Sequence, residues 1–384
     1  MSGIVGAGLS VLGPASVLGP VPASAQTAAG LSGPPSEWGA QVSVGGTWYD
    51  NPRFVPGGRR SSSWSTRGRA SLSHTRRFRT GSFSLSGYGG RLYYPEIEGF
   101  SQWTYGGSTS LGWTASRSTS LSLSQDYSRS NTRQLTSLDE EEEGLPVPTT
   151  GVHSFRSNLG LTHRLGRRTQ LEMGGAFRWR RYDNPTLVGG EQLHSSIGLA
   201  RLIGQNGAVS LGYGFSQSWF DQRGGRVHVA TLGVRERPAR GWSVELSGGA
   251  AYLETFEQFH PTGQASLGVS GRRVSASARY HRDFGLAFGY GRETIADRAS
   301  VSLGWTPVER LSFQARYSYG YRRDPADEDF RVHSHVLSGG LSWSIPGGVG
   351  FSASYAWERS RTESFGEASG QRATASLSYG FGWR

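Results

Sequence analysis

The sequence contains no cysteine and no lysine. The missing cysteine predicts that the chain has no lipoprotein anchor, disulfide, thiolate metal site or cysteine nucleophile. Long apolar runs are missing too, because from residue 27 onward no stretch approaches the about 18 apolar residues of a transmembrane helix. A segment that is polar at every second position cannot face lipid as a helix, so any membrane crossing must use strands.

The composition combines low hydropathy with many aromatic residues. Only 35% of residues are hydrophobic and the mean hydropathy is -0.45, which is too polar for a helical membrane protein. The 12 Trp, 16 Tyr and 17 Phe are too many for a disordered chain. A β-barrel with an apolar outer face and a wet lumen satisfies both observations.

The charge is strongly basic. All 40 basic residues are arginine, and 29 acidic residues leave a formal net charge of +11. Such a balance is compatible with nucleic-acid binding or with a pore that favours anions. The arginines are spread along the chain rather than clustered, so we expect no nucleic-acid partner.

The N-terminus has the features of an export signal. Ile4 to Val21 is uncharged and largely apolar, and Ala23-Ser24-Ala25 provides the small residues that signal peptidase accepts. A flexible Gly/Pro/Ala tail is the alternative. We therefore predict three parts, namely a signal peptide at 1–25, a short periplasmic segment at 26–37 and a transmembrane barrel at 38–384.

Period-2 alternation runs through the chain from Trp38 onward. Trp38, Val42 and Trp48 fall on one strand face, whereas Gln41 and Ser43 fall on the other. Tight turns alternate with longer polar connections, and eight turns with nine loops predict an all-β, up-and-down antiparallel transmembrane barrel of about 18 strands, with 16–20 as the range. A β-propeller is disfavoured, because its blades need shorter strands that are buried on both faces.

The predicted connections follow from turn-forming and polar residues. The tight turns are expected near 76–79, 116–119, 166–168, 204–207, 238–241, 270–273, 307–310 and 346–349. The longer loops are expected near 50–61, 95–101, 130–152, 183–190, 220–225, 254–262, 284–294, 322–330 and 359–370.

All tryptophans fall on the apolar face, and indoles concentrate where lipid meets headgroups. Two aromatic girdles are therefore predicted. The girdle at the tight-turn end consists of Trp38, Trp113, Trp242, Trp305, Trp343 and Trp383, and the girdle at the loop end consists of Trp48, Trp64, Trp103, Trp179, Trp219 and Trp357. The ten-residue spacing from Trp38 to Trp48 spans roughly 24 Å on a tilted strand, close to the apolar band of a barrel.

The opposite face carries more arginines than acids. The candidate selectivity residues are Arg67, Arg69, Arg156, Arg178, Arg180, Arg279, Arg298, Arg316 and Arg372. The acids predicted to share this face are Asp126, Glu172, Glu245 and Glu358. Fixed guanidinium charge in a lumen lowers the energy of anions and raises that of cations, so a diffusive pore should favour anions. The competing hypothesis is that these arginines pair with acids in a narrow or plugged lumen.

Two short elements carry a resemblance to known families. The final segment, in which Ala373, Leu377, Tyr379, Phe381 and Trp383 alternate with small polar residues, resembles the terminal strand of outer-membrane β-barrel proteins, although Arg384 follows the last aromatic residue. The resemblance implies recognition by the outer-membrane insertion machinery. Tyr49-Asp50-Asn51-Pro52, repeated at Tyr182-Asp183-Asn184-Pro185, resembles an element of porin-like β-barrels associated with exopolysaccharide loci. This implies polysaccharide export proteins as partners.

Catalytic, cofactor and metal sites are not predicted. The acidic run Asp139 to Glu143 matches no metal-binding loop, so we interpret it as a solvated loop. His333 and His335 share a strand face but lack a third ligand. No arrangement of His, Ser and Asp suggests an enzyme, although some barrels carry catalytic residues at their outer rim.

We therefore expect a barrel of a Gram-negative cell outer membrane, in contact with the lipid bilayer and lipopolysaccharide. Its predicted function is passive, porin-like transport of anionic or sugar-like solutes. Participation in exopolysaccharide export is the main alternative, and a structural barrel or a surface-rim enzyme are the others.

Overall fold

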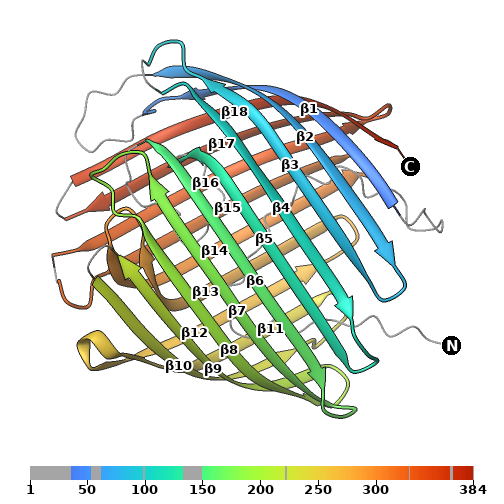
Figure 1. The fold of residues 1–384 in the computed structure, drawn as a ribbon, viewed down its shortest axis with the longest axis vertical. Coiled ribbons are helices and arrows are strands. Elements are labelled where there is room, and N and C mark those ends of the chain that lie inside the picture. Colours follow the sequence, from blue (N-terminus) through green and yellow to red (C-terminus); the bar gives the residue numbers. More distant parts are fainter. Residues whose placement is uncertain are drawn as a thin grey trace.

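The computed structural model describes residues 36–52, 62–97, 100–132, 149–220, 223–327, 329–363 and 366–383. These residues form one closed antiparallel barrel of 18 strands, in which β18 pairs with β1 (Figure 1). The predicted fold class and strand number are therefore confirmed. The predicted signal peptide, the acidic run Asp139 to Glu143 and Arg384 lie outside the described residues.

Each strand pairs with its neighbours in the sequence, as expected for an up-and-down barrel. The strands are β1 (Ser36–Tyr49), β2 (Ser63–Phe78), β3 (Gly81–Tyr93), β4 (Gln102–Thr114), β5 (Thr119–Asn131), β6 (Gly151–Arg164), β7 (Thr169–Tyr182), β8 (Gly190–Ile203), β9 (Gly207–Phe220), β10 (Arg223–Glu236), β11 (Trp242–Leu253), β12 (Gln258–Ser270), β13 (Val274–Ala287), β14 (Arg292–Val308), β15 (Leu311–Arg323), β16 (Arg331–Ile345), β17 (Val349–Thr362) and β18 (Gly366–Trp383).

The two faces of the wall differ in the way that the alternation predicts. Residues paired across an antiparallel ladder share a face, so the register extends each face around the barrel. Leu211 pairs with Leu232, and Val234 pairs with Leu246, and all four side chains are more than half exposed. These apolar side chains form an exposed outer band, as lipid contact requires.

Tryptophans lie near the ends of this outer face. Trp48 pairs with Trp64 at the loop end, and Trp38 pairs with Trp383 at the turn end. The ring of Trp305 stacks on Phe313 with centroids 5.3 Å apart. The two girdles themselves stay a prediction.

Several connections are shorter than the sequence pattern predicted. The segment 254–262, predicted as a loop, contains the 3-10 helix η1 (Glu254–Phe256) and the start of β12. Similarly, β15 continues to Arg323 and β17 to Thr362, inside predicted loops. The strands continue there because backbone hydrogen bonds do not require apolar side chains. Within the described part of the chain, no helix has the length and apolar character needed to cross a membrane.

A charge on the outer band should destabilise the barrel. Leu246 lies on this band and is 55% exposed, whereas the adjacent Ser247 lies on the opposite face. We expect Leu246→Arg to lower the free energy of unfolding by about 2–4 kcal/mol, because a lipid-facing guanidinium must be desolvated. The measurement is denaturant-dependent folding into lipid vesicles. Ser247→Arg is the control, and equal losses from the two variants would contradict the assignment of the faces.

Candidate pore lining and constriction

The predicted selectivity arginines all lie within strands, on the face opposite the tryptophans. Arg67 and Arg69 are on β2, Arg156 on β6, Arg178 and Arg180 on β7, Arg279 on β13, Arg298 on β14, Arg316 on β15, and Arg372 on β18. They therefore surround the lumen instead of forming one cluster. Arg180 is buried, with 5% of its surface exposed.

One group of luminal arginines lies on β2 and β3. The Arg69 guanidinium lies over the Tyr88 ring, 3.6 Å from its centroid. Arg67 is two residues away on the same face. Gly90 faces Arg69 across the ladder, and Gly106 is the partner of Tyr88, so there is little side-chain bulk beside this pair. The arrangement provides two neighbouring cations and one aromatic ring on the lumen wall.

A second group forms a row across β5, β6 and β7. In this row Asp126 pairs with Arg156, and Arg156 pairs with Arg178. One carboxylate thus accompanies two guanidinium groups. Arg316 and Arg372 also share a row, but Ser338 and Ala356 separate them.

The structure adds charged residues that the sequence reasoning missed. Arg235 donates to Glu245 at 2.7 Å, so one predicted luminal acid is paired with an arginine on β10. Asp283 lies 3.6 Å from both His281 and Arg298. The alternation assigns these residues to the luminal face, and only the register shows which of them are close enough to pair.

The β13–β14 hairpin leaves the barrel wall at the loop end. β12 pairs with β13 only as far as Gly263 and Arg282, although β13 continues to Ala287. β13 and β14 remain paired up to Ala287 and Arg292. The upper part of the hairpin therefore separates from β12 as a two-stranded unit. Gly289 and Gly291 have φ values of 91° and 62°, which a tight reversal favours.

The tip of this hairpin contacts β9 and the connection between β7 and β8. Val188, in the connection between β7 and β8, exchanges two backbone hydrogen bonds with Gly289, at 3.1 and 2.9 Å. Ser218 on β9 donates to Glu293 at 2.6 Å. β10, β11 and β12 lie between β9 and β13 in the strand order, so these contacts bridge three strands on the luminal side.

Apolar packing fills the space around the tip. Phe288 is 3% exposed, packs with Phe220, Tyr182 and Val188, and lies 5.0 Å below the Arg180 guanidinium. A small cavity remains beside the hairpin, lined by Gln192, Ser216, Ser218, Val227, Leu253, Phe284, Gly285, Glu293 and Thr294. The hairpin and this packing thus occupy part of the lumen at the loop end.

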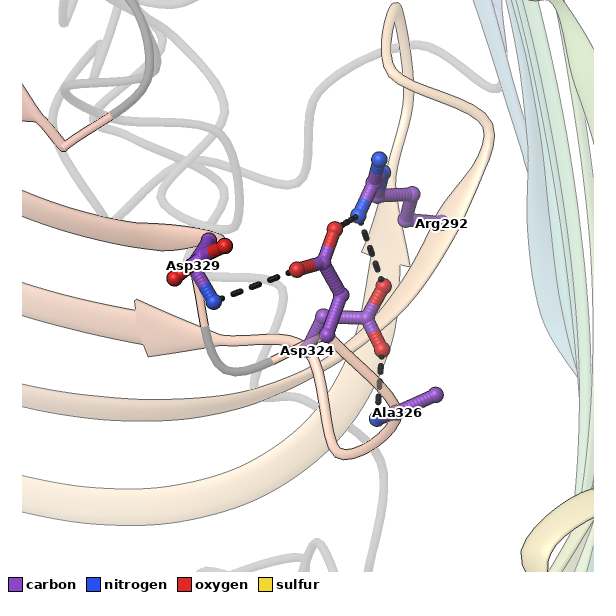
Figure 2. Close-up of polar contacts among 5 residues, drawn as sticks. Arg292, Asp324, Ala326 and Asp329 are labelled. Atoms are coloured by element: carbon purple, nitrogen blue, oxygen red, sulfur yellow. Dashed lines mark hydrogen bonds and ion pairs between the residues drawn. The ribbon is translucent and has the colours of Figure 1, made fainter.

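Arg292, next to the tip of the hairpin, links it to the connection between β15 and β16 (Figure 2). Its Nη1 donates to Asp324 at 3.2 Å and also to Asp327. The backbone N–H groups of Ala326 and Asp329 donate to Asp324 and Asp327 at 2.8 and 3.1 Å. The hydrogen bond from Arg292 holds the pKa of the Asp327 carboxyl below its usual value. Burial raises the pKa of Tyr290, near the hairpin tip.

The two Tyr-Asp-Asn elements occupy equivalent positions at the loop end. Tyr49 packs with Leu92 and Tyr94 inside the rim, and Asn51 donates to the Ser369 carbonyl at 2.9 Å. In the second copy, Asn184 accepts from the Thr186 N–H at 3.0 Å and stabilises the turn that carries Val188. Both elements therefore have structural roles in positioning loops.

The described residues contain no group of three or more His, Asp or Glu side chains that could hold a metal. His333 and His335 lie on the outer face, where each bonds a tyrosine hydroxyl. The exposed position of Leu337 on the same face of β16 identifies this side of the strand.

The closed barrel, its apolar outer band and its charged interior define an outer-membrane type of β-barrel protein. No family model matches the sequence, and no curated relative is found.

Among solved structures, OccAB4 of Acinetobacter baumannii is 11% identical, with a TM-score of 0.50, and the match covers 91% of this chain and 98% of that chain.

OpdQ of Pseudomonas aeruginosa is 12% identical over 91% of this chain and 98% of that chain, with a TM-score of 0.50. A mutant of the ferric enterobactin receptor PfeA, also of Pseudomonas aeruginosa, is 8% identical over 90% and 80% of the two chains, with the same TM-score. At these identities the similarity shows the fold alone.

Proposed function

We propose that this protein is a porin-like channel of the outer membrane, with an arginine-rich lumen that favours anionic or sugar-like solutes. The observation that carries the proposal is the distribution of arginine around the lumen, on strands from β2 to β18. Fixed positive charge in a narrow aqueous passage favours anions. Ion pairs such as Arg235 with Glu245 reduce this effect without removing the excess of arginine.

The inward-folded β13–β14 hairpin is the proposed size filter. It narrows the loop end, where Arg180 lies beside Phe288. A solute entering from the loop side would meet this constriction first and the arginine groups on β2 and β6–β7 afterwards. Selection by size would thus precede selection by charge.

The test is single-channel recording of the purified, refolded protein in a planar bilayer under a salt gradient. Discrete steps with a reversal potential on the anion-selective side are expected. Cation-selective steps would refute the charge assignment. A correctly folded barrel that does not conduct would refute the open channel and favour a closed or structural barrel. The Tyr-Asp-Asn elements add no support for polysaccharide export, because both have structural roles.

The constriction should respond to acid through Asp327. A carboxyl with a lowered pKa contributes its interaction fully above its ordinary pKa, and the contribution is lost as pH falls through the lowered value. Protonation of Asp327 would leave Arg292 with fewer charged partners and loosen the tip of the hairpin. We expect conductance to stay constant from pH 7 to about pH 4 and to rise reversibly, by up to about twofold, as the pH falls further below the ordinary carboxyl pKa.

Asp327→Asn should give the higher conductance already at neutral pH and reduce its pH dependence. Arg292 keeps its hydrogen bond to Asp324 in this variant. Glu309→Gln, in the turn at the opposite end of the barrel, is the control. A pH response that is identical in the Asp327 variant and the parent protein would contradict this role.

A further inference from the structure

The outer face of β15–β18 carries a band of cationic residues next to the loops. The register places Tyr321, His333 and Arg361 in one row, and Tyr319, His335 and Arg359 in the next row. Arg323 and Arg331 pair above them. We call Arg323, Arg331, His333, His335, Arg359 and Arg361 the outer-rim patch.

This patch continues directly from the apolar band. The row below it consists of Tyr317, Leu337 and Trp357, which the ladder pairs across β15, β16 and β17. Leu337 is 47% exposed and Tyr317 is 43% exposed, so this row belongs to the outer surface. Going toward the loops, the surface therefore changes from aliphatic to aromatic and then to cationic, as a lipid-facing wall does at the headgroup level.

The patch contains more arginines than carboxylates that form ion pairs with them. Arg331 lies 3.7 Å from Glu363, and Arg359 lies 2.7 Å from Glu367. Among the described residues, no carboxylate forms an ion pair with Arg323 or Arg361. The local charge is therefore positive before the histidines are considered.

Tyrosine hydroxyls orient the two imidazoles of the patch. The Tyr317 hydroxyl lies 2.9 Å from His335 Nδ1, and the Tyr319 hydroxyl lies 3.2 Å from His333 Nδ1. The rings of Tyr321 and His333 are also close, with centroids 4.8 Å apart. These contacts limit side-chain motion, so a ligand would meet a partly ordered surface.

We propose that the outer-rim patch binds the phosphate groups of a phosphorylated glycolipid of the lipid A type in the outer leaflet. Arginine donors match the geometry of phosphate oxygens and form charge-assisted hydrogen bonds with them. The patch lies just beyond Trp357, where headgroup phosphates begin. The proposal rests on the membrane placement of the barrel but not on conduction, so it can fail while the channel proposal stands.

The test is native mass spectrometry of the full-length protein in detergent, titrated with diphosphoryl lipid A. We expect Arg359→Gln combined with Arg361→Gln to weaken binding about tenfold, since two charge-assisted contacts are lost. Arg226→Gln is the matched control, because Arg226 lies on the outer face of β10 and its charge pairs with Glu254 at 3.6 Å. The lysine pair, Arg359→Lys with Arg361→Lys, should retain part of the affinity and guards against misfolding of the glutamine variant.

The source of the phosphate is resolved by two further titrations. Monophosphoryl lipid A should bind more weakly than the diphosphoryl form, and inorganic phosphate at millimolar concentration should not compete. Equal affinity of the parent and glutamine variants would overturn the proposal. Efficient competition by inorganic phosphate would also overturn it, since the patch would then be a simple anion site.

Discussion

Replacing residues 286–293 with Asn-Gly should raise the single-channel conductance about threefold, because the constriction is removed while the barrel wall is kept. Gly285 pairs with Thr294, so a two-residue turn can join them without changing the register. The change removes Phe288, Gly289 and Glu293, and with them the contacts that cross the lumen. The measurement is conductance in planar bilayers, after far-ultraviolet circular dichroism has confirmed the strand content.

A single substitution tests the same hairpin with a smaller change than the replacement of residues 286–293, and it has a matched control. Phe288→Ala should raise conductance by a smaller factor, because the buried ring is lost but the backbone contacts of Gly289 remain. Phe259→Ala truncates an aromatic residue near the same rim that is 74% exposed, so it should leave conductance unchanged. If the hairpin replacement folds and conducts like the parent protein, the limiting constriction lies elsewhere.

Removing Arg67 and Arg69 together should lower the ratio of anion to cation permeability about threefold, since both charges line the lumen. Glutamine is the replacement of choice, because it keeps polarity and much of the side-chain length. The readout is the reversal potential under a salt gradient, which reports selectivity independently of pore width. The shift should decrease at high ionic strength, where salt screens fixed charge.

Arg91→Gln is the control for this change. Arg91 pairs with Gly68, between Arg67 and Arg69 in height, but it lies on the outer face, 5.6 Å from the Trp103 ring. Its loss should leave the reversal potential unchanged. A similar shift from the outer and luminal substitutions would mean that general protein charge sets the selectivity rather than the lumen lining.

The sequence determined the barrel, because period 2 is a local property. Each strand must present Trp, Leu and Val to one solvent and Ser, Gln and Arg to the other, so adjacent residues such as Leu246 and Ser247 are assigned to faces without tertiary information. Alternating tight and long connections then fixed the order and number of strands. The same period-2 alternation places the nine predicted arginines on the face that lines the lumen.

The sequence pattern lost accuracy where strands pass beyond the lipid. There both faces become polar, so the hydrophobic alternation fades although the ladder continues, as in β15 up to Arg323. This is why 322–330 and 359–370 were predicted as loops. For the same reason, the sequence pattern does not place His333 and His335 in a cationic outer rim.

Only the tertiary structure decided where the β13–β14 hairpin goes. Val188 and Gly289 are about a hundred residues apart, and their hydrogen bonds exist because the hairpin bends away from the wall toward β7–β9, past the intervening strands β10, β11 and β12. Nothing local distinguishes a hairpin tip that folds inward from one that projects outward, since both use the same turn residues. The sequence by itself therefore specified the wall and its two faces, whereas the position of the hairpin depends on contacts between segments that are far apart in the sequence.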